Sequence, residues 1–60
     1  MEFVEWQGNV INSISLLLDC TYSDATGIYD AQESYADQAW GKGMNAEDTA
    51  KLIIDKSTVH

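Results

Sequence analysis

The sequence contains no arginine, and basic residues are scarce altogether. Three lysines stand against ten aspartates and glutamates, so the formal net charge is −7. Lysine and arginine supply most of a protein's affinity for nucleic acid, because they neutralise phosphates. The composition therefore argues against direct binding of DNA or RNA.

Proline, internal repeats and low-complexity segments are also missing, so nothing marks a linker. We expect a single domain over residues 1–60. A domain of this length buries only about 60% of the surface that its unfolded chain exposes, so its stability should be marginal. Hydrophobic residues make up 45% of the chain, which is too many for a disordered protein. The chain should therefore fold, with a second copy in a homodimer or another partner as a source of added stability.

Cysteine occurs once, and no run of apolar residues is long. The lone Cys20 excludes an intramolecular disulfide and fits a reducing compartment. The first charged residues, Glu2 and Glu5, are negative, unlike the start of a secretory signal. The run ISLLL, residues 14–18, is far too short to cross a bilayer. These features predict a cytoplasmic protein without a membrane role.

The first third of the chain has the spacing of an amphipathic helix. From Phe3 to about Leu18, apolar side chains recur every three or four residues. The stripe consists of Phe3, Trp6, Val10, Ile14 and Leu17. Residues 10–18, VINSISLLL, also show β-branched side chains and partial alternation, so a strand within an α+β fold is an open alternative there.

Two further segments predict helices. One runs from about Asp24 to Trp40, with Thr21 or Asp24 as its cap and Gly41 in the left-handed conformation that ends it. The other runs from Asn45 to about Asp55. Asn45 is a good cap, and the acidic residues that follow it suit the positive end of the helix dipole. The predicted fold is all-α, a compact bundle of about three short helices.

The stretch DAQESYADQAW, residues 30–40, combines three carboxylates with two aromatic rings. On a straight helix Asp30, Glu33 and Asp37 lie within about 60° of one another and form an acidic stripe. Such a helix spaces them by about 1.5 Å per residue and points them outward, so they cannot converge on one metal ion. A calcium loop fits poorly as well, because Tyr22 would occupy the first ligand position. We therefore expect no metal site.

Catalytic groups and cofactor motifs are not apparent. The only histidine, His60, is the last residue, and no serine or cysteine has a visible base partner. Paired carboxylates act as acid and base only in a cleft that shifts a pKa, and three short helices can hardly enclose one. We expect neither a catalytic residue, nor a cofactor, nor enzyme activity.

The segment AWGKGM, residues 39–44, has the spacing of a helix-turn-helix, with Met44 and Leu52 at plausible core positions. The following helix would then read DNA. It offers Glu47 and Asp48 against the single base Lys51, which opposes contact with phosphate. The segment is better explained as a tight connection between packed helices.

The strongest signal is the uneven distribution of charge. Residues 1–41 contain seven acidic residues and no basic one, and the lysines follow at positions 42, 51 and 56. The simpler explanation is that the acids solvate a small protein. The functional explanation is that an acidic face is steered toward a basic surface, including one built to hold nucleic acid.

With its 60 residues, no arginine and Asp30, Glu33 and Asp37 on one helix, the chain resembles small acidic inhibitors of phages and mobile elements. These are the anti-CRISPR and other DNA-mimic anti-defence proteins. The resemblance is one of general character and transfers no site residue. It implies a protein that occupies the nucleic-acid site of a host nuclease or CRISPR surveillance complex.

The predicted partner-binding residues are Asp30, Glu33, Asp37 and Trp40. The predicted function is that of an acidic inhibitor that binds a basic, nucleic-acid-handling protein surface. The alternative is a small assembly or adaptor subunit. In that case the contact is made by exposed aromatic side chains, namely Phe3, Trp6, Tyr35 or Trp40.

Overall fold

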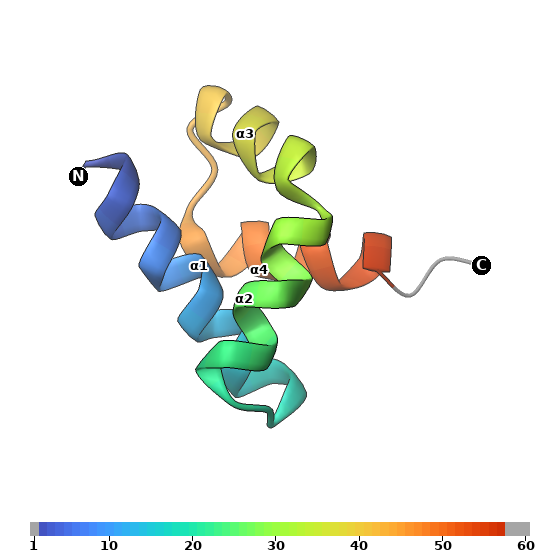
Figure 1. Ribbon diagram of the computed structural model, residues 1–60. Coiled ribbons are helices and arrows are strands. Elements are labelled where there is room, and N and C mark those ends of the chain that lie inside the picture. Colours follow the sequence, from blue (N-terminus) through green and yellow to red (C-terminus); the bar gives the residue numbers. More distant parts are fainter. Residues whose placement is uncertain (1, 58–60) are drawn as a thin grey trace.

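The computed structural model describes residues 2–57, which form four helices and no strand (Figure 1). These are α1 (Phe3–Leu18), α2 (Tyr22–Ala31), α3 (Glu33–Gly41) and α4 (Ala46–Ser57). The all-α prediction is confirmed. The strand alternative is wrong, because residues 10–18 belong to α1. His60 lies outside the described residues.

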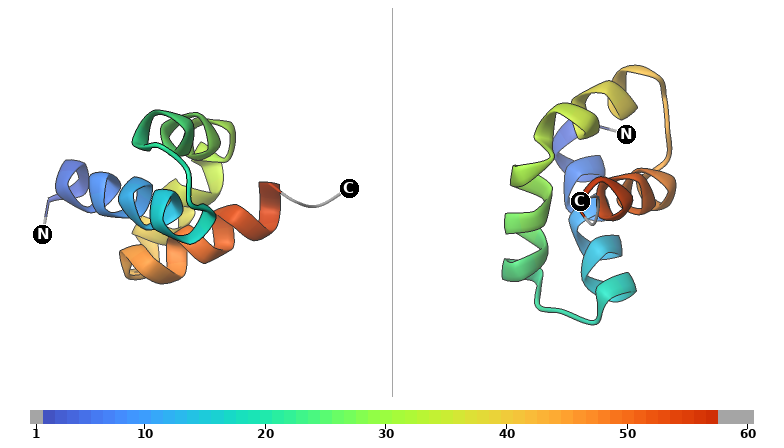
Figure 2. Two further views of the ribbon diagram at one scale, coloured as in Figure 1. Left: turned by 90° about the horizontal axis from the view of Figure 1, so that it is seen from below. Right: turned by 90° about the vertical axis from the view of Figure 1, so that its right-hand side faces the viewer.

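The longest helix, α1, packs against both α2 and α4. In Figures 1 and 2, α1 and α2 run side by side in opposite directions, and α4 crosses them. All four helices contribute to one core. Its buried apolar members are Trp6, Val10, Ile11, Ile14, Ala25, Tyr29, Ala36, Ala39, Ala50 and Ile53. The large ones come mainly from α1 and α4, whereas α3 contributes only alanines.

The amino-terminal end of α1 is joined to the end of α3 by aromatic rings. The ring centroid of Trp40 lies 5.1 Å from that of Trp6 and 5.3 Å from that of Phe3, the latter in an edge-on arrangement. The indole nitrogen of Trp6 donates a hydrogen bond of 3.0 Å to the carbonyl of Met44, in the connection between α3 and α4. This end of α1 is therefore fixed by tilted and edge-on ring contacts and by a hydrogen bond.

The predicted middle helix, from Asp24 to Trp40, is wrong as a single element. The chain leaves the helical conformation at Gln32, where φ is −119° and ψ is 30°, and the axis changes direction (Figures 1 and 2). The bend lets Tyr29 of α2 and Ala36 of α3 both reach the small core.

The end of α3 is set by Gly43 rather than by the predicted Gly41. Gly43 has a φ of 76°, whereas Gly41 is still helical. The amide of Gly43 donates to the carbonyl of Trp40, and that of Met44 to the carbonyl of Ala39, both at 3.0 Å. This pair of bonds is the Schellman arrangement, in which a left-handed residue closes a helix.

The starts of α2 and α4 agree with their predicted caps. The Thr21 hydroxyl accepts from the amide of Asp24 at 3.1 Å, and the Asn45 side chain accepts from the amide of Asp48 at 2.7 Å. Because each cap satisfies an amide that has no partner within its helix, it fixes where the helix begins.

Candidate binding surfaces

The three predicted carboxylates lie on two helices, so they do not form one straight stripe. Asp30 is near the end of α2, and Glu33 and Asp37 lie one turn apart on α3. All three side chains are exposed. No ion pair engages them within residues 2–57, and residues 22–41 contain no basic side chain. We call Asp30, Glu33 and Asp37 the acidic surface.

All three carboxylates of the acidic surface influence the ionisation of the buried Tyr29 side chain, although they lie on both sides of the bend. Burial raises the pKa of Tyr29 above its ordinary value, and the negative charges of Asp37, Glu33 and Asp30 raise this pKa further, whereas the neighbouring Gln7 side chain, as a hydrogen-bonding group, lowers it. The contact with Gln7 falls outside strict hydrogen-bond geometry, so it is a weak one. The carboxylates of the acidic surface therefore disfavour ionisation of the buried Tyr29 phenol.

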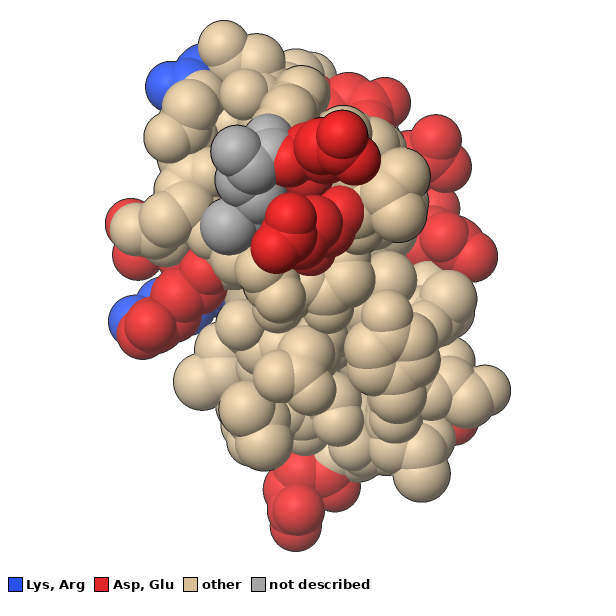
Figure 3. All heavy atoms as spheres, turned by 90° about the vertical axis from the view of Figure 1, so that its left-hand side faces the viewer, with Lys and Arg blue, Asp and Glu red and all other residues tan. Residues whose placement is uncertain are grey.

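Positive charge is confined to the last third of the chain. Lys51 of α4 forms an ion pair of 3.4 Å with Glu47, and Lys56 lies 5.3 Å from the ring centre of Tyr35 on α3. On the face of the molecule drawn in Figure 3, carboxylates lie in the upper middle and at several edges, lysines lie on the left, and a broad area of the lower half carries no charge. Acidic and uncharged surfaces are thus segregated.

Trp40, the fourth predicted site residue, is only partly available. Its side chain is 37% exposed, and its ring packs on Phe3 and Trp6. Among the other aromatic candidates, Trp6 is buried, and Phe3 and Tyr35 are half-buried. These rings chiefly hold helices together, so they leave little area for an aromatic-mediated contact.

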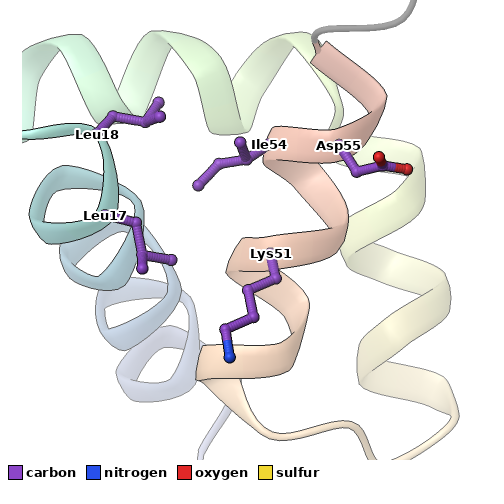
Figure 4. A pocket seen from close by; sticks show the side chains of 5 residues that line it. All are labelled: Leu17, Leu18, Lys51, Ile54 and Asp55. Atoms are coloured by element: carbon purple, nitrogen blue, oxygen red, sulfur yellow. The ribbon is translucent and has the colours of Figure 1, made fainter.

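Sequence reasoning missed a groove between α1 and α4. It has a volume of about 340 Å³ and is lined by Leu17 and Leu18 of α1 and by Lys51, Ile54 and Asp55 of α4 (Figure 4). An adjoining hollow of about 150 Å³ shares Leu17 and is also lined by Leu16 and Glu47. Leu16 and Leu17 are 74% and 49% exposed. We call the two hollows together the leucine groove.

A signal for this groove was present in the sequence. Successive residues of a helix are rotated by about 100°, so three leucines in a row cannot all face one core. Leu16, Leu17 and Leu18 are all exposed, and the buried face of α1 is formed by Trp6, Val10, Ile11 and Ile14. Where α4 would lie against these leucines depends on the tertiary packing.

Within residues 2–57, no group of three or more His, Cys, Asp or Glu side chains is arranged to hold a metal ion. None of the described helices has the length and apolar character needed to span a membrane. Comparison with protein-family models, curated proteins and solved structures finds no match for this chain.

Proposed function

We propose that this protein is a non-enzymatic inhibitor that presents its acidic surface to a basic protein surface that handles nucleic acid. A nuclease or a CRISPR surveillance complex has the required chemistry. The observation that carries the proposal is the exposure of Asp30, Glu33 and Asp37 in a 20-residue segment, 22–41, that has no basic residue. Unpaired carboxylates of this kind remain available to a partner.

Electrostatics explains why such a surface would compete with nucleic acid. Charges of one sign over a small area attract a surface of opposite sign and raise the association rate. The net charge of −7 also keeps the protein away from phosphates, so it would not itself bind the nucleic acid that it displaces. A basic cleft built for phosphate is therefore a better partner than a neutral surface.

The test begins with capture of partners from host extract by the wild-type protein. A second capture uses the variant in which Asp30, Glu33 and Asp37 are all changed to Lys, which alters the charge by six units, from −7 to −1. We expect the wild type to retain a nucleic-acid-binding protein that duplex DNA or RNA releases, and the variant to retain none.

The matched control changes Glu2, Glu5 and Asp48 to Lys, because these exposed residues lie outside α2 and α3 and the net charge again becomes −1. This control should still capture the partner. Equal capture by the variant of the acidic surface, or a partner that binds nucleic acid and this protein together, would refute the proposal.

A small assembly or adaptor subunit is the second candidate. The observation that favours it is the leucine groove, since exposed apolar residues that line a hollow are typical of protein contacts. In this form of the hypothesis the partner contact is made by leucines and not by the aromatic side chains, because most of those are packed against other helices. Partner binding would then be insensitive to reversal of the acidic surface.

A further inference from the structure

The leucine groove carries an inference that does not depend on the acidic surface. We propose that it is a docking site for a basic amphipathic helix of a partner protein. It lies on α1 and α4, whereas the proposed inhibitory contact lies on α2 and α3.

The apolar content of the groove comes from both helices. In Figure 4 the side chains of Leu17, Leu18 and Ile54 point into the same space. Leu17 borders both hollows, of about 340 and 150 Å³, so the two lie in series. Two hollows in series suit successive apolar side chains on one face of a helix, spaced by three or four residues.

The charges around the leucine groove determine which kind of ligand it attracts. Glu47 and Asp55 line the groove and Asp19 directly follows Leu18, whereas the only base in the lining is Lys51, whose ammonium lies 3.4 Å from Glu47. The surroundings are therefore negative, like the whole molecule. A second copy carries the same charge of −7 and is repelled, as is an anionic lipid surface. A basic segment is attracted.

The lining describes the ligand further. A partner helix that lies along the groove would place Leu, Ile or Met side chains in the two hollows and Lys or Arg side chains at the rim. Long basic side chains can reach the rim while their stems stay on apolar surface.

The experiment uses a fluorescent synthetic peptide of about 14 residues, long enough for partial helicity. Leucines occupy one helical face and lysines flank them. Fluorescence anisotropy should show saturable binding with a Kd on the order of 10 μM, weakened when salt is added. Leu17→Gln should raise the Kd at least about tenfold, since a polar group replaces the shared side chain of both hollows.

Val4→Gln is the matched control, because Val4 is an apolar residue of α1 that is 74% exposed and lies outside the groove. It should change the Kd less than about twofold, as expected of a residue outside a contact. If Leu17→Gln does not fold, Leu16→Gln tests the same groove at a side chain that is 74% exposed. The variant with lysine at positions 30, 33 and 37 should retain Leu17-dependent binding, which separates this proposal from the proposed function.

Three results would overturn the proposal. The first is the absence of saturable binding, and the second is equal affinity of the peptide for wild type and for both leucine variants. The third is a dimer in sedimentation that requires Leu17 and strengthens with salt, because the occupant would then be a second copy. A peptide with Glu in place of Lys should not bind, and binding of it with equal affinity would refute the role of charge.

Discussion

The helix pair α1 and α4 differs from the pair α2 and α3 in what it contributes. The first pair has the longer helices, of 16 and 12 residues, and supplies Trp6, Val10, Ile14 and Ile53 to the core. The second has helices of 10 and 9 residues and buries mostly alanines. Burial of apolar area scales with side-chain size, so α1 and α4 should hold most of the stability. Because α2 and α3 contribute less to the core, their surfaces can carry unpaired charges at a smaller cost in stability.

The largest expected effect compares one isoleucine from each pair. Ile53→Ala in α4 removes a fully buried side chain and should lower the free energy of unfolding by about 2–5 kcal/mol. Ile28→Ala in α2 removes a half-buried side chain and should cost about 1 kcal/mol. Urea denaturation followed by circular dichroism measures both. Equal losses would contradict the assignment of stability to α1 and α4.

A smaller effect concerns Gly41 and Gly43, at the connection between α3 and α4. Substitution by alanine should change the stability in opposite directions at these two positions. Gly43→Ala places a side chain at a φ of 76° and should cost about 1–2 kcal/mol. Gly41→Ala lies within α3, where an added Cβ meets nothing within 4 Å, and should stabilise by about 0.5–1 kcal/mol. If thermal unfolding gave the reverse order, Gly41 and not Gly43 would end the helix.

The smallest effect concerns the large polar side chain that α2 places in the core. Tyr29→Phe removes a buried hydroxyl whose contact with Gln7 falls outside strict hydrogen-bond geometry, so stability at pH 7 should stay equal or rise by up to about 1 kcal/mol. A loss of more than about 1 kcal/mol in urea denaturation would show that the hydroxyl is bound after all.

The same residue predicts a pH dependence. The pKa of Tyr29 is raised in the folded protein above its unfolded value of about 10. The neutral phenol therefore stabilises the fold fully below pH 10, and this contribution is lost as pH rises through the folded pKa. Wild type should lose more stability than Tyr29→Phe above about pH 10. Parallel alkaline unfolding curves would contradict the raised pKa.

Local signals predicted where α2 and α4 begin, whereas the bend depended on the whole molecule. Asn45 and Thr21 accept amide hydrogen bonds from residues three positions later, so a short stretch of sequence contains the cap. Gln32 is neither proline nor glycine, and its segment keeps helical spacing on both sides. The break lies between two residues that both reach the core, because Tyr29 before Gln32 and Ala36 after it are buried.

The candidate surfaces also divide into features that local sequence predicts and features that depend on tertiary packing. Exposure of Asp30, Glu33 and Asp37 follows from their charge, because unpaired carboxylates are rarely buried. Trp40 was predicted to bind a partner, but its packing depends on Phe3 and Trp6, residues far away in sequence. The leucine groove likewise needs α4 beside the end of α1. Side-chain chemistry thus predicted the exposed carboxylates, whereas the three consecutive leucines indicated exposed apolar side chains on α1 but not the groove that α4 completes.

The most direct test of the central claim measures the Kd of the captured partner at about 50 and 300 mM salt, where the Debye length falls from about 14 to 6 Å. Wild type and the control with lysine at positions 2, 5 and 48 should bind tightly at low salt and at least about tenfold more weakly at high salt. The variant with lysine at positions 30, 33 and 37 should not bind at either concentration. A folded variant that binds with wild-type affinity and the same salt dependence would contradict the account, because the acidic surface would then only solvate the protein.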